Sequence, residues 1–400
     1  MQQHVVQHAQ AILVSAEPRD SRVLVFSQRE LHRASFHAPQ YEFEDVLTEI
    51  EDVRLLSPRP AAESPTHQMT RHLVNGTKKR VGVPRRSPPW NRPSMTVTPV
   101  TTQHDLFFAV FNDAYQVSYL HRLPGWRQSC RRAVCFLLEA WTNFVDRDAD
   151  YYRLLRDFDD VYLFTPASAP ALRSLGVPAP QFLAAGTDAL TFAPWRRPGP
   201  RSLDVLSYGR TSPLVHAQLL EMARADEIAY LYDSMSDGVV TDFPQHRLLQ
   251  ASMMKRSSFF IAHRINDSPE RRRRTGGEES LSTRYFEGAA GGAVMLGTSP
   301  PVAEFDDNFD WPDAVIDLPW DARDVRELLR ELAQQPERLA LARANAIGNS
   351  LLRHDWVHRW ETVLSGADMS LLAAARRRQA LLAAAAEAVA PGVAVTNYQP

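Results

Sequence analysis

The chain is poor in cysteine, in net charge and in long apolar runs. Its 400 residues include only two cysteines, Cys130 and Cys135, which excludes a disulfide framework or a cysteine zinc site and predicts a reducing, cytoplasmic environment. The formal net charge of −2 argues against a protein that binds bulk nucleic acid. No apolar run approaches membrane-spanning length, and residues 1–19 lack a cationic start followed by an apolar core. We therefore expect a soluble protein, with peripheral membrane contact left open.

A dinucleotide-binding glycine motif is also missing. No Gly-x-Gly-x-x-Gly follows the first apolar run, residues 22–26, which argues against a Rossmann dehydrogenase. No internal repeat is evident beyond the similarity of two α/β halves. What is present is an ordinary globular composition, with 44% hydrophobic residues, and a length that predicts two domains.

Apolar runs of strand length alternate with helical patterns along most of the chain. A near-continuous run such as residues 105–111 is typical of a parallel strand that helices cover on both faces. The predicted strands are residues 22–26, 53–56, 105–111, 133–138, 160–165, 203–208, 228–232, 258–262 and 293–296. The predicted helices are residues 166–175, 213–223, 244–255, 281–291, 321–349, 351–364 and 370–390. This alternation predicts an α/β fold with doubly wound parallel sheets.

Changes in composition divide the chain into segments. Residues 1–20 are expected to be a flexible extension. Residues 58–99 are rich in Pro, Arg, Ser and Thr, which predicts an irregular excursion. A stretch rich in Pro and Gly over residues 180–200 is typical of a linker. We therefore expect a first domain over residues 21–190, a second over residues 191–365, and a C-terminal helix and tail over residues 366–400.

The stretch over residues 276–292 is the most informative part of the chain. It runs from Gly276 and Gly277 through a short predicted helix into an apolar strand. Such a loop presents backbone N–H groups and the positive end of a helix dipole, which suits a diphosphate, and glycine lets the ligand approach closely. Glu279 on the loop and Glu287 in the helix can line one cleft. There they would accept hydrogen bonds from sugar or ribose hydroxyls.

This stretch resembles the donor-binding segment of two-domain GT-B glycosyltransferases, and in particular the glycosyltransferase-4-like and CgeB-like (spore maturation) groups. The resemblance rests on Glu279, seven residues, Glu287 and a Gly-Ala-Ala-Gly-Gly run, and on the hinge-like phrase GTDALTFAP at residues 186–194. It implies two Rossmann-like domains facing each other across a cleft. It also implies an enzyme of polysaccharide biosynthesis that moves a sugar from a nucleotide-diphosphate sugar to a hydroxyl of a glycan, lipid or small molecule.

The same resemblance assigns roles to the two carboxylates. Glu287 would accept a hydrogen bond from the ribose, and Glu279 would contact hydroxyls of the transferred sugar. The transfer would retain configuration, and the leaving phosphate would take the acceptor's proton, so that no protein base, metal ion or other cofactor is required. Arg284 stands one helical turn before Glu287, so a donor contact and a structural ion pair with Glu287 are the alternatives for it.

Arg210 follows the predicted strand 203–208, at the end where parallel sheets bind ligands. Its guanidinium can contact phosphate with two hydrogen bonds, and the resemblance assigns an Arg here to the donor diphosphate. The lysine that many relatives carry a few residues later is missing, because residues 211–218 hold none. Candidates to replace it are His263, Arg284 and the run Arg271–Arg274. For the run the alternative is a solvated loop, and for His263 a structural role.

The first domain is expected to hold the acceptor. Gln28 and Arg29 follow the first predicted strand, and Glu139 follows the strand that ends at residue 138, so all three lie at the binding end of a parallel sheet. The sequence does not rank the candidate bases, which are His32, His37, His104 and His121.

Three rival interpretations remain open. Asp146, Asp148 and Asp150 fit the Asp-x-Asp pattern of metal-dependent transferases, but their context is helical, so we expect a solvated acidic segment and no metal site. A GT-B sugar-nucleotide epimerase needs acid and base groups on both faces of the sugar, and these are not located here. A nucleotide-sugar-binding or surface-assembly protein without turnover is the third, and the missing lysine favours it.

Overall fold

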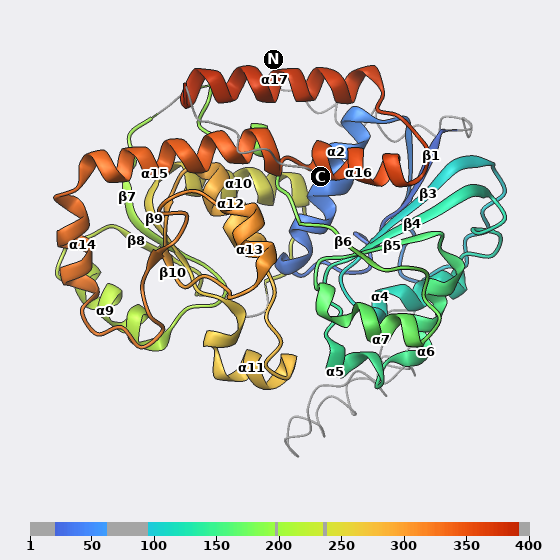
Figure 1. Cartoon of the computed structure of the whole chain (residues 1–400), viewed down its shortest axis with the longest axis horizontal. Helices are drawn as coiled ribbons and strands as arrows, with labels where there is room; N and C mark the ends of the chain where they lie inside the picture. The colour runs from blue at the N-terminus through green and yellow to red at the C-terminus, as the bar shows by residue number, and fades with distance from the viewer. Residues whose placement is uncertain (1–20, 62–94, 197–198, 235–237, 392–400) are drawn as a thin grey trace.

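The structure, a computed structural model, describes residues 21–61, 95–196, 199–234 and 238–391. The predicted extension at residues 1–20 and residues 62–94 of the predicted excursion lie outside the described residues. The chain forms two parallel sheets, each flanked by helices, which stand next to each other in Figure 1. The predicted architecture of two α/β domains is therefore confirmed.

The first sheet has six parallel strands in the order β2-β1-β3-β4-β5-β6. Its strands are β1 (Val23–Phe26), β2 (Val53–Leu56), β3 (His104–Phe111), β4 (Cys130–Leu137), β5 (Asp160–Leu163) and β6 (Gln181–Phe182). Its helices are α2 (Ala38–Ile50), α4 (Ala114–Val117), α5 (Thr142–Val145), α6 (Ala149–Tyr152), α7 (Ala169–Ser174) and α8 (Ala189–Phe192). All four residues of β1 are fully buried, because neighbouring strands and helices cover both of its edges and faces.

The second sheet has five parallel strands in the order β11-β10-β9-β7-β8. Its strands are β7 (Leu203–Ser207), β8 (Tyr230–Tyr232), β9 (Ser257–Ala262), β10 (Val294–Gly297) and β11 (Ile316–Asp317). Its helices are α9 (Pro213–Arg224), α10 (Phe243–Arg256), α11 (Pro269–Thr275), α12 (Thr283–Gly291), α13 (Ala303–Asn308), α14 (Val325–Ala333) and α15 (Pro336–Asn349). In both sheets the chain reverses its direction of strand addition next to the first strand, so β1/β3 and β7/β9 are the switch points where such sheets bind ligands.

Two helix predictions differ from the structure at their boundaries. The predicted helix over residues 321–349 is two helices, because Pro336 begins α15 and the residue before a proline avoids the helical conformation. The predicted helix over residues 351–364 is interrupted at Asp355. Ser350–His354 form a π-helix directly after α15, and α16 begins at Trp356, where the Asp355 side chain accepts a hydrogen bond from the backbone N–H of Val357. No helix within the described ranges combines the length and the apolar character needed to cross a membrane.

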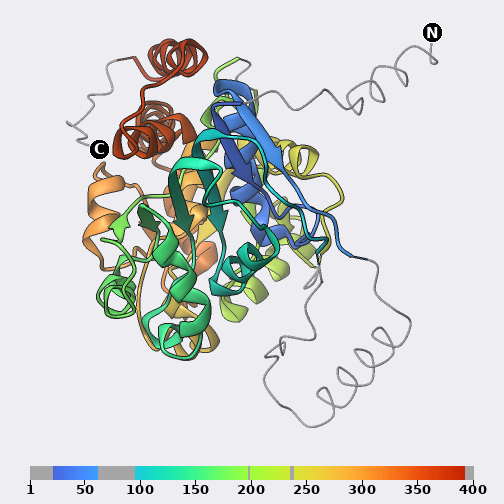
Figure 2. The same cartoon turned by 90° about the vertical axis from the view of Figure 1, so that its right-hand side faces the viewer.

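The last two helices, α16 (Trp356–Gly366) and α17 (Ala373–Val389), return to the first domain. The Trp356 ring stacks on Phe43 of α2 with centroids 4.5 Å apart, and the Trp360 ring lies 5.3 Å from that of Phe108 in β3. α17 runs along the top of the molecule in Figure 1, and it lies beside α16 in Figure 2. One hydrophobic core therefore continues from the first sheet through these helices to α12 and β9.

Candidate functional site

The carboxyl ends of β7 and β9 meet at the switch point of the second sheet. Tyr208, Gly209 and Arg210 follow β7, and His263 follows β9. The N-terminus of α12 reaches the same edge, because the Arg210 guanidinium (Nη2) donates to the Ser282 hydroxyl, which stands at the N-cap of α12, at 2.9 Å. The tertiary structure therefore gathers three segments that are far apart in sequence into one site.

Arg284 lies directly over the backbone of the Gly209–Arg210 turn. Its Nη1 atom donates to the carbonyl oxygen of Arg210 at 2.9 Å. Gly209 has φ +73°, in the left-handed region that favours glycine, and a Cβ atom at this position would collide with the Arg284 guanidinium. Glycine is therefore required at position 209 both for the turn and for the space that Arg284 occupies.

Neither Arg210 nor Arg284 forms an ion pair with a carboxylate among the described residues. Burial, and after it the neighbouring charge of Arg210, lowers the pKa of Arg284 to about 9. Burial is also the largest cause of the lowered pKa of Arg210, and the charge of Arg271 adds to it. Two close guanidinium groups without a carboxylate partner make this edge a site for an anion.

The first turn of α12 adds to the positive potential. The backbone N–H groups of Thr283 and Arg284 have no acceptor inside the helix, as at every helix N-terminus, and the helix dipole is positive there. The Ser282 side chain does not cap them, because its hydroxyl accepts from Arg210 instead. The positive potentials of the helix N-terminus and of the two arginines therefore add up at the same edge of the sheet.

His263 is fully buried at this edge. Its ring packs edge-on against Trp320, with centroids 5.0 Å apart, and its Nδ1 atom lies 3.9 Å from the Asp267 carboxylate. Neither ring nitrogen has a hydrogen-bond partner within the described part of the chain. Burial lowers the pKa of His263 to about 4, although Asp267 opposes this shift, so the ring is neutral at pH 7.

Glu279 lies on the loop that leads to α12, at the same edge. Its Oε1 atom accepts from the backbone N–H of Asn266 at 3.2 Å and lies 3.8 Å from the Arg264 guanidinium. Its Oε2 atom is buried without a partner among the described residues. Burial raises the pKa of Glu279, and the charges of Arg264 and Arg210 oppose the rise. The structure thus brings Glu279, Arg210, Arg284 and His263 together, and their roles stay predictions.

The paired glycines Gly276 and Gly277 lie at the C-terminal end of helix α11. The backbone N–H groups of Gly276 and Gly277 both donate to the carbonyl oxygen of Arg272, and both residues have positive φ, +70° and +85°. They end helix α11 in the way that glycines commonly end helices. Their two amides are therefore already bonded, and the unpaired amides lie later, in the first turn of α12. A close approach of the donor to these glycines stays a prediction.

The loop around the glycines contacts the first domain. The Glu278 carboxylate accepts from the backbone N–H of Thr142 at 3.0 Å, and Asn143 donates to the carbonyl oxygen of Arg274 at 2.9 Å. Arg274 in turn lies 3.3 Å from Glu139, the residue predicted to serve the acceptor. Glu139 therefore stands at the junction of the two domains, already paired with a member of the Arg271–Arg274 run.

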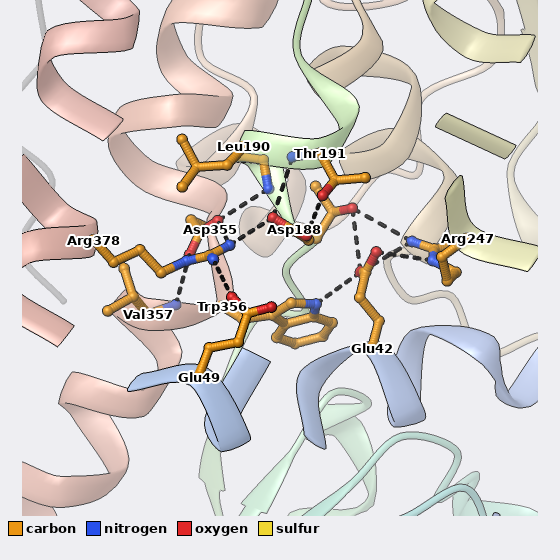
Figure 3. A network of polar contacts seen from close by, with 12 residues as sticks. Glu42, Glu49, Asp188, Leu190, Thr191, Arg247, Asp355, Trp356, Val357 and Arg378 are labelled. Atoms are coloured by element: carbon orange, nitrogen blue, oxygen red, sulfur yellow. Dashed lines mark hydrogen bonds and ion pairs between the residues drawn. The ribbon is translucent and has the colours of Figure 1, made fainter. Parts of the chain in front are cut away.

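Glu287 is buried in a polar network rather than exposed in a crevice. Its Oε2 atom accepts from the Tyr208 hydroxyl at 2.8 Å, and its Oε1 atom accepts from Arg247 of α10 at 2.5 Å. Arg247 also pairs with Glu42 of α2, in the first domain (Figure 3). Glu287 thus forms its ion pair with Arg247, and the structural alternative for Arg284, a pair with Glu287, is not what the structure shows.

Two residues of this network, Tyr208 and Arg247, were not predicted from the sequence. Tyr208 carried a usable signal, because it stands at a predicted strand end directly before Gly209. Arg247 carried none, because a single arginine within an otherwise ordinary helix is normally solvated. Its burial depends on two carboxylates from segments far away in sequence.

The predicted site residues of the first domain form hydrogen bonds or ion pairs within the protein. Gln28 is fully buried and donates to the carbonyl oxygen of Gln116 at 2.9 Å, which leaves its own side-chain oxygen without a partner among the described residues. The Arg29 charge is paired with Glu44 at 3.1 Å and with Asp45 at 2.7 Å. The roles of Gln28 and Arg29 in binding the acceptor stay predictions.

The four candidate histidines lie at three different places in the structure. His32 and His37 lie on the loop after β1, with ring centroids 5.4 Å apart, at the ligand-binding end of the first sheet. Burial lowers the pKa of His32 to about 4 and that of His37 to about 3. His104 begins β3, at the opposite end of the sheet from His32 and His37. His121 is exposed on a turn.

The acidic segment that fits the Asp-x-Asp pattern is helical. Asp148 is paired with its neighbour Arg147, and Asp150 is paired with Arg153 at 2.5 Å. Within the described ranges, no group of three or more His, Cys, Asp or Glu side chains is placed to hold a metal ion.

Part of the sequence and the whole fold are similar to known proteins. Residues 245–365 match the family described as glycosyl transferase-like. A comparison with curated proteins yields no match. The fold is similar to that of an α-glucosyltransferase solved with UDP and DNA containing an HMU base, at 10% identity and a TM-score of 0.51, over 87% of this chain and 99% of that one.

A similar likeness extends to α,α-trehalose 6-phosphate synthase from Burkholderia multivorans, at 10% identity and a TM-score of 0.50, over 87% of this chain and 98% of that one. At such identities the likeness shows a shared fold. Taken with the two parallel sheets, these findings show the GT-B fold that the sequence predicted, and residues 245–365 match the glycosyl transferase-like family.

Proposed function

We propose that this protein is a glycosyltransferase that moves a sugar from a nucleoside-diphosphate sugar to an acceptor hydroxyl, with retention of configuration and without a metal ion. The observation that carries the proposal is the pair Arg210 and Arg284, two adjacent guanidinium groups without a carboxylate partner among the described residues. A doubly charged diphosphate at this edge would supply the missing negative charge.

The reaction explains why such a site is useful. Breaking the bond between the anomeric carbon and the phosphate oxygen builds negative charge on the diphosphate and positive charge on the sugar ring. Arg210, Arg284 and the N-terminus of α12 lie at one edge of the sheet, and we propose that they stabilise the departing diphosphate. In this proposal Arg284 supplies the positive charge of the lysine that is missing from residues 211–218.

Glu279 supplies the contact to the transferred sugar. Its free Oε2 atom can accept a hydrogen bond from a sugar hydroxyl, while Asn266 holds the other oxygen. We propose that the leaving phosphate removes the acceptor's proton on the same face of the sugar, as in the retaining enzymes that the sequence resembles. Glu287 would contact the ribose, which requires a ribose hydroxyl to join or replace the bond from Tyr208.

Our proposal for the donor's nucleotide is based on solved structures of similar fold. An α-glucosyltransferase of this fold binds UDP, and in another complex UDP-glucose. We propose a nucleoside diphosphate of this kind for the present chain, a hydroxyl acceptor on a glycan, lipid or small molecule, and a cytoplasmic location. Within the GT-B fold we place the chain with the glycosyltransferase-4-like and CgeB-like groups, on its Glu279–Glu287 spacing.

Thermal unfolding with a panel of nucleoside mono- and diphosphates and their sugars tests the proposal. A diphosphate at 100 times its dissociation constant should stabilise the native state by about 2.7 kcal/mol. Arg210→Met and Arg284→Met should lose this stabilisation, whereas Arg330→Met, on the exposed face of α14, should keep it. The proposal fails if no diphosphate stabilises the wild type. Product formation from the stabilising donor then separates transfer from binding without turnover.

A further inference from the structure

Arg247 joins the two domains next to the proposed donor site, through Glu42 and Glu287. Its Nε and Nη2 atoms donate to the two oxygens of Glu42 in α2, at 2.9 and 3.0 Å. Its Nη1 atom donates to Glu287 in α12 at 2.5 Å. A single guanidinium therefore binds one carboxylate from each domain, and the close view in Figure 3 shows the Glu42 side of this contact.

The surroundings of Arg247 exclude water. The exposed fractions of Arg247, Glu42 and Glu287 are 4%, 4% and 3%. The guanidinium carbon lies 4.6 Å from the centre of the Phe192 ring, and Trp356 donates to Glu42 from the other side at 2.8 Å. Removing one member of such a buried group leaves an uncompensated charge, so each carboxylate depends on Arg247 for its position.

The shape of the guanidinium makes this link stiff. Arginine offers donors in a rigid planar fork, so the position of Glu42 sets the direction of the Nη1–Glu287 bond. From Glu287 the contacts continue to the Tyr208 hydroxyl, and Tyr208 is bonded through Gly209 to Arg210. An unbroken series of short contacts thus runs from α2 of the first domain to the proposed diphosphate site of the second.

We infer that Arg247 is a positioning residue that couples the donor site to the acceptor domain, through Glu42 on one side and Glu287 on the other. Arg247 itself does not touch substrate. It holds the Glu287 carboxylate where the ribose is bound, and it does so fully only while Glu42 is engaged. The inference rests on the proposed function, and it requires that donor affinity depend on Glu42, a residue of the opposite domain.

A second buried arginine offers a matched control. Arg378 of α17 binds Asp355 with two bonds of 2.8 Å and Asp188 with one of 2.6 Å, and it lies 3.4 Å from Glu49 (Figure 3). Glu49 stands two turns after Glu42 on the same helix. Arg378 therefore joins segments in the same manner as Arg247, but its partners are not among the residues of the donor site.

The test compares Glu42→Gln and Arg247→Lys with Arg378→Lys and Glu49→Gln in the full chain. The ligand is whichever of UDP, ADP and GDP stabilises the wild type most, and its dissociation constant is measured by calorimetry below the unfolding temperature of every variant. Glu42→Gln and Arg247→Lys should each weaken binding by about fivefold or more. Arg378→Lys and Glu49→Gln should leave the dissociation constant within about twofold, whatever their effect on unfolding.

Two outcomes would overturn the inference. If Glu42→Gln binds the nucleotide as the wild type does, Arg247 is only a structural link. The same conclusion follows if Arg378→Lys weakens binding as much as Arg247→Lys, because general loosening then explains both. Glu42→Gln keeps a hydrogen-bonding side chain of the same size, so it provides the result even if Arg247→Lys fails to fold. If the wild type itself binds none of the three nucleotides, the proposed function fails and takes the inference with it.

Discussion

Arg284 donates a hydrogen bond of 2.9 Å to the backbone carbonyl of Arg210, so that one arginine holds the backbone of another. The contact keeps two positive side chains close together against their repulsion, at the carboxyl end of β7. Such an arrangement lowers stability unless an anion arrives, and proteins commonly keep arrangements of this kind where they bind or react with a ligand.

Replacement of Glu279 by Gln should strongly reduce transfer while the fold stays intact. The amide oxygen can still accept from the N–H of Asn266, but it contacts sugar hydroxyls and a positive sugar ring less strongly than a carboxylate does. We expect kcat to fall by about 100-fold. The matched control is Glu278→Gln, the adjacent carboxylate, which binds the N–H of Thr142 instead. Full activity in Glu279→Gln, measured by product formation, would show that the site is wrongly assigned.

Replacement of Gly209 by Ala should weaken donor binding more than it weakens the fold. Alanine at φ +73° costs about 1–2 kcal/mol of stability. Its Cβ atom would also displace the Arg284 guanidinium, the far end of a flexible side chain, and so disperse the paired charge. We expect the dissociation constant of the nucleoside diphosphate to rise by about tenfold or more.

Gly199→Ala is the control for this change, because a Cβ atom there would have no neighbour within 4 Å. Denaturant unfolding and calorimetry together separate the two effects. Unchanged binding in Gly209→Ala, with only the loss of stability, would show that the position of Arg284 does not matter for the donor.

His263 should make the protein less stable in acid. Its pKa lies at about 4 in the folded protein, chiefly because of burial, against 6.5 for the free side chain. Between these values the unfolded chain binds a proton that the folded protein does not. The stability that the neutral ring contributes is therefore complete above pH 6.5 and is lost as the pH falls toward 4. At pH 5 the loss is about 2 kcal/mol.

The measurement compares denaturant unfolding of the wild type and His263→Gln at pH 7.5 and 5.0. The wild type should lose about 2 kcal/mol more than the variant over this interval. Burial also lowers the pKa of His32 and His37, and it raises the pKa of Glu44 to about 7, which acts in the opposite direction. These groups are present in both proteins, so their contributions cancel. Equal losses in the two proteins would contradict the assignment.

Removal of divalent metal ions should leave transfer unchanged. The Asp148 carboxylate is paired with Arg147, and the carboxylate of Asp150 is almost fully exposed, so these residues form no enclosed ligand set. We expect activity in EDTA to stay within about twofold of that in magnesium, and Asp148→Asn to behave as the wild type. Loss of activity in EDTA that magnesium or manganese restores would refute the metal-independent mechanism, and the same loss in Asp148→Asn would locate the ion.

Much of the fold and part of the site could be predicted from local patterns in the sequence. The buried strands were evident because a strand covered on both faces must be apolar throughout, as residues 105–111 are. Arg210 and His263 were predicted as site residues because they follow such strands, and the structure brings them to one edge of the sheet, where parallel sheets bind ligands. The Glu279–Glu287 spacing pointed to the segment that is proposed to bind the donor. Each of these signals lies within a short stretch of chain, where the sequence alone determines the outcome.

Only the tertiary structure decided which partner each polar group finds. The Gly276 and Gly277 amides bond to the helix before them rather than to a ligand, and Glu287 pairs with Arg247 rather than with Arg284, its neighbour by one turn. The physical reason is that a hydrogen bond or ion pair depends on distance and burial in space. Glu42 and Arg247 are 205 residues apart in the chain and 2.9 Å apart in the protein, and no local pattern contains that contact.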